Sequence, residues 1–287
     1  MKIQVRDLSF GYKGRYVLSM PDVQFEKGKA YGIVGRNGVG KTTFFKCLVN
    51  IITNYHGQVL IDQEDVRTNP RILNKVGIVL DDMSLYKNRT GMFNLRYFVG
   101  LRGAIDTSQI FKLADELGIA TALDQKVATY SLGMTKKLQL LISLISDAEI
   151  LIFDEPFRGL DSGTVDWFRD YLIGLKGQGK TILISSHVQE DIEAISDNVL
   201  VLENGNFIKE FDLKDQNQEF IYTVGVDQKD ATKALLESLN IRVEEAGELL
   251  RFYAFEVEYQ KFFKEAISQG IVFEQIKKEV QFAKFVR

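Results

Sequence analysis

The hydrophobic pattern of the first part of the chain changes period several times. Short alternating runs at Ile3 to Phe10, at Val17 and at Val23 to Phe25 predict antiparallel strands joined by turns. An uninterrupted apolar run at Ala30 to Val34 predicts a short buried strand, and a glycine-rich loop follows it directly. After Gly40 the spacing becomes helical, with apolar residues at Phe44, Phe45, Leu48, Val49 and Ile52.

The middle of the chain departs from this strand and helix alternation. From about residue 88 to residue 147 the pattern is helical throughout, as at Gln109 to Leu117 and at Thr135 to Ile145. We interpret this stretch as a helical subdomain inserted into an α/β core. The alternation then resumes with segments at Ile150 to Phe153, Val165 to Leu175, Thr181 to Ser185, Val199 to Leu202 and Phe207 to Glu210. The last two flank Asn204-Gly205, which is a strong signal for a hairpin.

A second pattern begins at about Asp212. It predicts strands at 220–226, 242–245, 250–256 and 271–276, and helices at 231–239 and 259–268. The resulting order, βαββαβ, is the ferredoxin-like arrangement. We therefore expect a large domain over residues 1–211 and a small α+β accessory domain over residues 212–287.

Composition and charge narrow the possible functions. The formal net charge is -3 and the isoelectric point is about 5.6, which argues against nonspecific binding of nucleic acid. We expect no signal peptide in the opening residues, and the longest apolar stretches, such as Leu138 to Ile145, are far shorter than a membrane-spanning helix. The single cysteine, Cys47, rules out an internal disulfide and fits a reducing compartment, where we interpret it as a buried apolar side chain.

The glycine-rich loop carries the most specific motif. Residues 35–42 match G-x-x-x-x-G-K-[ST], the Walker A pattern, between an apolar strand and a helix. In such a loop the backbone N–H groups surround a phosphate, the lysine (Lys41) reaches the β- and γ-phosphates, and the hydroxyl (Thr42) binds Mg²⁺. The predicted nucleotide-binding residues are Gly35, Asn37, Gly38, Gly40, Lys41, Thr42 and Thr43. The loop alone leaves an ATPase, a nucleotide kinase and a GTPase open.

Two later strands end in polar residues that suit phosphate chemistry. The strand that begins at Ile150 ends in Asp154 and Glu155, whose side chains point to opposite sides. We predict that Asp154 holds Mg²⁺, the Walker B role, and that Glu155 is the general base or orients the attacking water. His187 follows another core strand and is a candidate γ-phosphate sensor. A lone pair of carboxylates is often a solvated turn and a lone strand-end histidine is usually structural, so these assignments depend on the whole pattern.

Residues 130–138, Tyr-Ser-Leu-Gly-Met-Thr-Lys-Lys-Leu, resemble the signature motif of ABC ATPases, in the variant found in drug and peptide exporters. Ser131 and Gly133 match the serine and second glycine of that motif, whereas Leu132 and Met134 replace its first glycine and its glutamine. Other ABC landmarks stand in order around it. Tyr12 resembles the aromatic residue that stacks on adenine, residues 159–161 with Asp161 resemble the D-loop, and His187 matches the switch histidine.

The resemblance covers roughly residues 1–210 and implies a P-loop NTPase core of the ABC ATPase type, with an antiparallel β layer and a helical subdomain. It implies that ATP and Mg²⁺ are the cofactors. It also implies a head-to-tail dimer, a homodimer or a heterodimer with a second ABC ATPase, in which Ser131 of one subunit closes over ATP held by the other. A separate transmembrane permease is the implied partner, which places the chain in the cytoplasm at the inner face of the membrane. The implied cargo is a drug, an antimicrobial peptide or a lantibiotic, which the ATPase does not contact.

Two segments are less regular than the motifs. The family has glutamine at the Q-loop, where alignment of residues 76–81 puts Asp81 and a register shifted by one residue puts Asp82. Asp81 keeps an oxygen that can bind Mg²⁺ but is shorter than glutamine and charged. By resemblance, the aromatic-rich segment from Met83 to Phe98 lines the groove for a helix of the permease, although its aromatic residues could simply pack the helical subdomain. We expect a regulatory, dimer-supporting or purely stabilising role for the C-terminal domain.

Two alternatives remain from the sequence. An ABC ATPase of translation or DNA repair would need two such domains or long coiled coils, and the sequence pattern contains neither. The net negative charge of the chain also argues against this class. A nucleotide-binding subunit that scarcely hydrolyses ATP is disfavoured by Glu155 and His187, and Asp81 leaves that alternative open.

Overall fold

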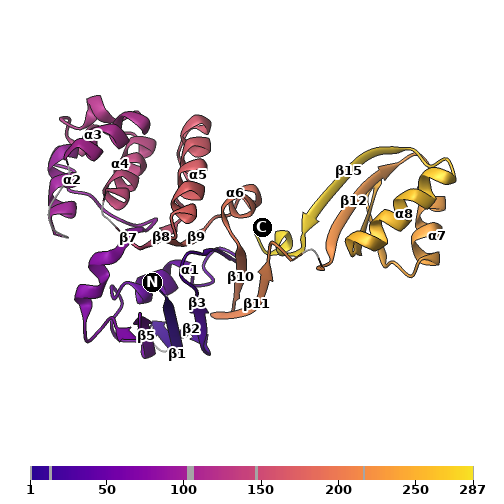
Figure 1. The fold of residues 1–287 in the computed structure, drawn as a ribbon, viewed down its shortest axis with the longest axis horizontal. Helices are drawn as coiled ribbons and strands as arrows, with labels where there is room; N and C mark the ends of the chain where they lie inside the picture. The colour runs from indigo at the N-terminus through magenta and orange to yellow at the C-terminus, as the bar shows by residue number, and fades with distance from the viewer. Residues whose placement is uncertain (1, 13–14, 102–106, 146–147, 216, 287) are drawn as a thin grey trace. The chain divides into compact units, whose positions relative to one another are not determined.

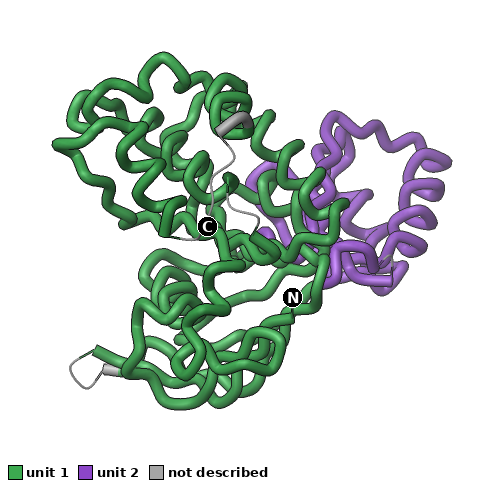
Figure 2. Tube along the Cα trace, turned by 60° about the vertical axis from the view of Figure 1, so that its left-hand side comes forward, with its two compact units in different colours: residues 1–211, 285–287 green, residues 212–284 purple. Residues whose placement is uncertain are grey.

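The computed structural model describes residues 2–12, 15–101, 107–145, 148–215 and 217–286. The chain divides into two compact units, one of residues 1–211 and 285–287 and the other of residues 212–284 (Figure 2). Each unit has its own hydrophobic core.

An antiparallel sheet opens unit 1. Its strands are β1 (Ile3–Tyr12), β2 (Arg15–Met20), β3 (Val23–Phe25), β5 (His56–Ile61) and β6 (Glu64–Asp65). Strand β1 is central, because it pairs with β2, β3 and β5. Its inward residues alternate with outward ones, as the sequence pattern predicts for a sheet with one buried face.

A second sheet carries the ends of the strands that form the site. It runs in the order β11-β10-β4-β9-β8-β7. The bounds are β4 (Ala30–Val34), β7 (Val76–Val79), β8 (Ile150–Asp154), β9 (Thr181–Ser185), β10 (Asn198–Glu203) and β11 (Asn206–Asp212). Strands β10, β4, β9, β8 and β7 are parallel, so their carboxyl ends share one edge. The turn between β10 and β11 has Asn204 and Gly205 at φ 49° and 78°, the left-handed pair that a tight hairpin requires.

Helices cover both faces of this parallel sheet (Figure 1). Helix α1 (Lys41–Leu48) shares one core with strands of both sheets, and its Phe44 packs against Phe25 and Phe207. Each such buried phenylalanine contributes roughly 2–3 kcal/mol. Helices α5 (Ser162–Gly177) and α6 (Gln189–Ile195) cover the other face, where Gly32 of β4 leaves room for Ile192.

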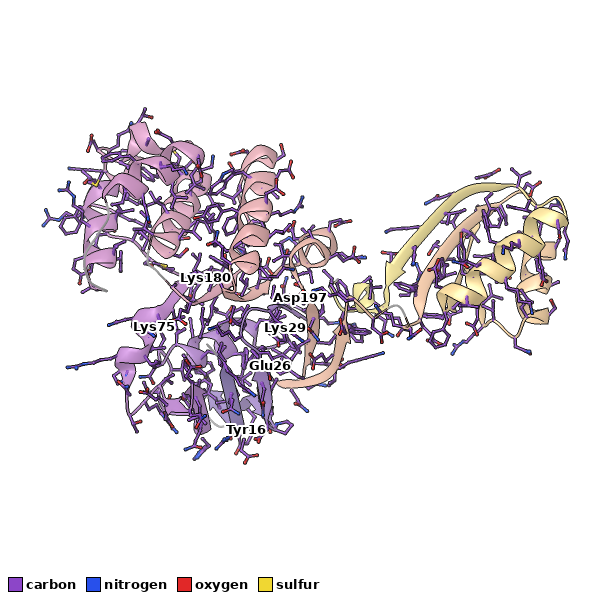
Figure 3. The ribbon with its side chains drawn as sticks, in the orientation of Figure 1. Tyr16, Glu26, Lys29, Lys75, Lys180 and Asp197 are labelled. Carbon is purple, nitrogen blue, oxygen red and sulfur yellow. The ribbon has the colours of Figure 1, made fainter. Side chains whose placement is uncertain are left out.

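Polar side chains fix the start of the parallel sheet. Asp197, just before β10, accepts a hydrogen bond from the backbone N–H of Ala30 at 2.9 Å (Figure 3). Lys75, just before β7, forms an ion pair with Glu149, just before β8, at 3.1 Å. These contacts hold neighbouring strands in register at the edge opposite to the site.

The helical subdomain predicted between residues 88 and 147 is present in the described residues. It contains α2 (Gly91–Gly100), α3 (Thr107–Glu116) and α4 (Leu132–Leu144), with 3-10 turns at Ala120–Ala122 and Val127–Thr129. Another 3-10 turn, Pro70–Lys75, precedes β7. The three helices gather on one side of unit 1 (Figure 1). In the part of the chain that the structure describes, no helix combines the length and apolarity that crossing a bilayer demands.

Unit 2 has the predicted ferredoxin-like order. Its elements are β12 (Phe220–Val226), α7 (Lys229–Ser238), β13 (Val243–Ala246), β14 (Leu249–Ala254), α8 (Glu256–Ser268) and β15 (Phe273–Val280), and η4 (Gln281–Phe285) follows them. The antiparallel sheet runs β13-β14-β12-β15. Aromatic side chains fill its core, with the rings of Tyr222 and Tyr259 stacked 4.0 Å apart.

Most boundaries of unit 2 lie within two residues of the prediction, and two differ by more. Helix α8 begins at Glu256 rather than at Tyr259, because the Glu258 carboxylate accepts the Phe255 backbone N–H at 2.9 Å and caps the helix earlier. Strand β15 continues to Val280 instead of ending at Ile276, because Lys277 and Lys278 pair with β12 although they are polar.

Candidate nucleotide site

The glycine-rich loop joins β4 to α1 in the predicted place. Gly35, Gly38 and Gly40 have φ values of 151°, 80° and 117°, which only glycine adopts without strain. A Cβ on Gly35 would lie 2.3 Å from the carbonyl oxygen of Leu202. Gly40 caps α1 and has no side chain to occupy the first N–H groups of the helix. These N–H groups and the helix dipole therefore remain available to an anion.

Lys41 is largely buried and curls back over this loop. Its Nζ donates hydrogen bonds to the carbonyl oxygens of Gly35 at 2.6 Å and Arg36 at 3.4 Å. Burial lowers the pKa of Lys41, and the nearby carboxylates of Glu155 and Asp154 oppose that shift. An incoming phosphate would add negative charge next to the ammonium and so favour its charged form.

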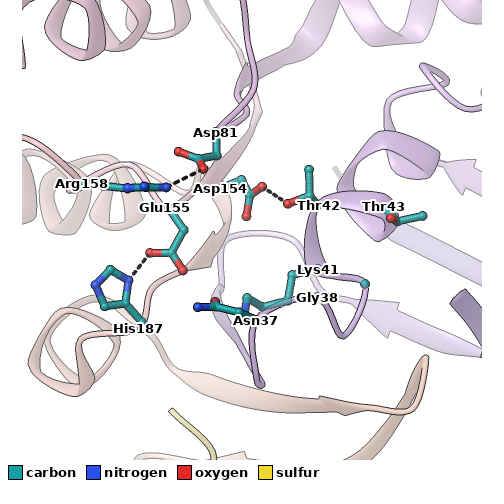
Figure 4. A pocket seen from close by; sticks show the side chains of 11 residues that line it. Asn37, Gly38, Lys41, Thr42, Thr43, Asp81, Asp154, Glu155, Arg158 and His187 are labelled. Carbon is teal, nitrogen blue, oxygen red and sulfur yellow. Dashed lines mark hydrogen bonds and ion pairs between the residues drawn. The ribbon is translucent and has the colours of Figure 1, made fainter. Parts of the chain in front are cut away.

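Asp154 ends β8 and is 1% exposed. One carboxylate oxygen accepts a hydrogen bond from the Thr42 hydroxyl (Figure 4). The other accepts one from the Ser185 hydroxyl at 2.7 Å. The parallel pairing of β8 with β9 puts Asp154 directly beside Ser185. Folding thus brings the loop hydroxyl and the strand-end carboxylate into direct contact.

Glu155 and His187 form a second pair at the same edge. Glu155 has a φ of 48°, and its backbone N–H donates to the Ser185 hydroxyl at 3.1 Å, which holds the chain in this left-handed turn. Its carboxylate lies 2.7 Å from Nδ1 of His187 (Figure 4). The Glu155 side chain is 15% exposed and that of His187 is 58% exposed, so Glu155 is largely shielded from solvent whereas His187 is accessible.

Most of these residues line one cavity of about 530 Å³. Its lining consists of Asn37, Gly38, Gly40, Lys41, Thr42, Thr43, Asp81, Asp154, Glu155, Arg158 and His187. Nine of the eleven are polar or charged, which suits a polyanion. Of the predicted residues in the described chain, Tyr12, Gly35, Ser131, Gly133 and Asp161 do not line this cavity.

Tyr12 lines a neighbouring hollow of about 480 Å³ that shares Gly38 with the first cavity. Tyr16 and Val17 of β2 lie in the same lining, together with Asn204 and Gly205. The Tyr12 side chain is 53% exposed and Tyr16 is 73% exposed, so both rings are accessible to a planar base. Tyr16, labelled in Figure 3, was not selected from the sequence, because an exposed tyrosine in a strand carries no motif.

Ser131, Gly133 and Asp161 lie together at another place on unit 1. Ser131 caps α4 by accepting the Met134 N–H at 3.1 Å, and Asp161 caps α5 by accepting the Thr164 N–H at 2.9 Å. Lys137 of α4 pairs with Asp161 at 2.9 Å. This ammonium and the Thr164 donors hold the pKa of Asp161 well below its ordinary value. A Cβ on Gly133 would lie 2.7 Å from the carbonyl oxygen of Gly159, so the first turn of α4 and the loop before α5 touch through their backbones.

The sequence missed three polar residues of this region. Ser185, which holds Asp154 and Glu155, ends a strand that was recognised, so its position was a usable signal. Arg158 and Lys136 both face Asp81, at 3.0 Å and 3.7 Å respectively. Nothing in the sequence pattern joins them, because Lys136 belongs to the helical subdomain and Arg158 follows β8.

The donors at the loop fit Mg²⁺. The Thr42 hydroxyl and the Asp154 carboxylate are hard oxygen ligands in direct contact. Within the described chain there is no group of three or more side chains of the His, Cys, Asp and Glu types placed to hold a metal by themselves. Mg²⁺ ordinarily uses one or two carboxylates together with substrate phosphates and water, so this sparse donor set is the suitable one.

The site combines three features: a glycine-rich loop that can bind an anion at the start of α1, a paired hydroxyl and carboxylate, and a paired glutamate and histidine at the ends of adjacent parallel strands. Together they define a P-loop nucleoside triphosphatase. The model of the ABC transporter family matches residues 18–158.

Known proteins place the chain more narrowly. It is 30% identical over 219 residues to the lantibiotic transport ATP-binding protein SrtF of Streptococcus pyogenes, covering 76% of this chain and 94% of that one. It is 32% identical over 244 residues to the bacitracin transport ATP-binding protein BcrA of Enterococcus faecalis, covering 83% and 79%. A solved ATP-binding subunit of an ABC transporter superposes with a TM-score of 0.68 at 25% identity, covering 75% and 92%.

The chain therefore belongs to the ATP-binding subunits of ABC transporters. Members of this family bind ATP, hydrolyse it to drive transport and work with transmembrane permeases. The fold class and the ATPase activity inferred from the motifs are confirmed.

Proposed function

We propose that this chain is the Mg²⁺-dependent ATPase subunit of an exporter. The observation that supports this most directly is the convergence of Lys41, Thr42, Asp154, Glu155 and His187 on one cavity. These residues come from the loop and from the ends of β8 and β9, which lie far apart in sequence and meet only in the fold.

Each group has a distinct role in the hydrolysis of ATP. Lys41 and the N–H groups at the start of α1 bind and neutralise the β- and γ-phosphates. Glu155 accepts a proton from the attacking water, which then bonds to the γ-phosphorus as the bond to ADP breaks. His187, held by Glu155 at 2.7 Å, donates a hydrogen bond to the γ-phosphate from its second ring nitrogen. Mg²⁺, when bound by Thr42 and Asp154, neutralises charge on the phosphate oxygens.

The adenine ring binds in the hollow beside Tyr12. Gly38 lines both this hollow and the phosphate cavity, so the two are neighbours and one ATP molecule can occupy both. Stacking on an exposed tyrosine is worth roughly 1–3 kcal/mol.

We propose a head-to-tail dimer, either of two copies of this chain or of this chain and a second ABC ATPase. Ser131 and Gly133 do not line the cavity of their own chain, and Leu132 beside them is 67% exposed. An N-terminal helix end with an exposed hydroxyl suits a phosphate presented by another subunit. The signature loop of one copy then completes the nucleotide site of the other.

The permease docks on the helical subdomain side of unit 1. A groove of about 550 Å³ is lined there by apolar side chains that include Val49, Ile51, Met83, Phe98 and Leu101. Near it the rings of Tyr86, Phe93 and Tyr97 form contacts with one another while remaining 40% or more exposed. Such an exposed apolar surface is typical of a binding site for a partner helix. The chain then sits at the inner face of the cell membrane, held there by the permease.

The relatives named for lantibiotic and bacitracin transport support an antimicrobial peptide or a drug as the cargo. The cargo contacts the permease rather than the ATPase. Unit 2, which has no residue in the described nucleotide cavity, is an accessory domain that supports the dimer or regulates it.

The dimer can be tested by cross-linking two variants that each carry one introduced cysteine. Cys47 is fully buried, so it contributes no background under native conditions. Mixing Ser131→Cys with Asn37→Cys subunits should give a disulfide-linked dimer that depends on ATP, because the signature of one copy then lies over the loop of the other. Each variant alone is the control. The absence of an ATP-dependent band would contradict a head-to-tail dimer of two copies of this chain, and phosphate release by the wild-type chain tests hydrolysis separately.

A further inference from the structure

Three charged side chains meet where the helical subdomain joins the nucleotide cavity. Asp81 follows β7, Lys136 lies in α4, and Arg158 lies in the loop after β8. One Asp81 oxygen (Oδ2) is 3.0 Å from Nη1 of Arg158, and the other (Oδ1) is 3.7 Å from Nζ of Lys136. Each oxygen of Asp81 therefore faces a different cation. We call these three residues the charged triad.

Lys136 is the member of the triad whose burial costs the folded state the most free energy. The residue is only 4% exposed, and its Nζ makes no hydrogen bond within the described part of the chain. Burial lowers the pKa of Lys136, and the Asp81 carboxylate is the strongest influence that opposes this shift. A buried ammonium without hydrogen bonds requires a nearby anion to remain in the folded state.

Arg158 occupies a different environment. Its side chain is 62% exposed and lines the nucleotide cavity beside Asp154, Glu155 and His187. An exposed ion pair contributes little to stability. Its pairing with Asp81 instead sets where the guanidinium lies, and a positive charge at the rim of the cavity favours a triphosphate (Figure 4).

Asp154 and Asp81, two of the three carboxylates that line the cavity, thus have different neighbours. Asp154 accepts hydrogen bonds from two neutral hydroxyls, and the Thr42 oxygen can itself bind a cation. Asp81 is surrounded by two positive charges, which gives the triad a formal charge of +1 and repels a dication.

We propose that Asp81 is a positioning residue: it is the shared counterion of Lys136 and Arg158, and it does not bind the metal. It joins α4 of the helical subdomain to the loop after β8 and keeps Arg158 at the rim of the cavity. This inference rests on the proposed ATPase function for its catalytic consequence, whereas its structural part can be measured without nucleotide.

The decisive variant is Asp81→Asn, which keeps the shape and removes the charge. Without nucleotide, we expect its melting temperature to fall by about 4 °C, because the buried Lys136 loses its anion. Adding Lys136→Met, an apolar side chain of similar length, should restore most of that loss. In the wild-type background, where Asp81 still faces Lys136, the same Lys136→Met change should lower the melting temperature instead.

Magnesium titration of ATP hydrolysis separates positioning from metal binding. We expect the half-saturating Mg²⁺ concentration of Asp81→Asn to stay within about twofold of wild type while kcat falls. Asp154→Asn is the reference for a lost metal ligand and should raise that concentration about tenfold or more.

The two measurements together can overturn the proposal. A rise in half-saturating Mg²⁺ comparable to that of Asp154→Asn would identify Asp81 as a metal ligand. Equal melting temperatures for wild type and Asp81→Asn, or no recovery with Lys136→Met, would remove its role as the counterion. If Asp81→Asn does not fold, recovery of a folded protein in the double variant would support the proposal, and failure of that variant to fold would refute it. An inactive wild type would contradict the ATPase function but would leave the thermal result valid.

Discussion

Glu155→Gln tests the assignment of the general base most directly. The substitution keeps the length of the side chain, so the amide can occupy the place of the carboxylate 2.7 Å from Nδ1 of His187. The backbone turn at φ 48° is held by Ser185 and does not depend on the carboxylate. The change therefore removes the proton acceptor with little effect on the geometry around it.

The expected magnitude follows from the chemistry of the site. A positioned general base accelerates proton transfer by about 10²–10⁴-fold, and each factor of ten corresponds to about 1.4 kcal/mol. We expect kcat to fall within that range. ATP binding should persist or become somewhat tighter, because Glu155 no longer places a negative charge near the γ-phosphate and Lys41 remains in place.

The assay combines phosphate release at saturating ATP and Mg²⁺ with size-exclusion chromatography. If hydrolysis is what separates the subunits, the variant should elute as a dimer with ATP and as a monomer without it. Glu149→Gln is a matched control, because Glu149 lies at the other end of β8 beside Lys75 and should leave kcat unchanged. A kcat within about threefold of the wild type would show that Glu155 is not the base, and a purely monomeric elution profile with ATP would count against the closed dimer.

Three further predictions concern single residues. Lys41→Ala should weaken nucleotide binding by about 100-fold or more in calorimetric titrations, whereas Lys46→Ala on the same helix should not, since Lys46 pairs with Asp82 away from the loop. Burial raises the pKa of the Cys47 thiol to about 12, so iodoacetamide at pH 8 should leave Cys47 unmodified until denaturant is added, and rapid native labelling would contradict its buried position. In unit 2, the hydrogen bonds from Lys233 and Lys229 lower the pKa of Glu245 from 4.5 to about 2. A lowered carboxyl pKa stabilises the folded state above the unfolded value, so the stability difference between wild type and Glu245→Gln in denaturant titrations should be full above pH 4.5 and disappear as the pH falls towards 2.

Much of the fold and the phosphate end of the site could be predicted from the sequence because their signals are local. The loop motif needs only residues 35–42 and their flanking strand and helix, and the hairpin at Asn204 and Gly205 needs only two left-handed residues. The ferredoxin-like order of unit 2 followed from the succession of periods. The prediction of unit 2 was wrong where a polar side chain determines the end of an element, as Glu258 does at the start of α8.

The charged triad could not be predicted, because its members belong to three elements whose proximity arises only from the packing of α4 against the sheet. The sequence assigned Asp81 to the metal by its position alone. Only the structure shows that both of its oxygens face cations and that Lys136 is buried. Ser185 is an intermediate case, since its strand was recognised but its contact with Asp154 depends on the parallel register of β8 and β9.

The backbone contact between Gly133 and Gly159, with the ion pair of Lys137 and Asp161 beside it, has a mechanical consequence. It couples the first turn of α4 to the first turn of α5 as a rigid joint, so tilting of the helical subdomain must also displace Asp161. Force applied to that subdomain would reach the rest of unit 1 through a few atoms that cannot compress. A methyl group at position 133 would push the two backbones apart, so a movement of the helical subdomain would no longer be transmitted fully to Asp161.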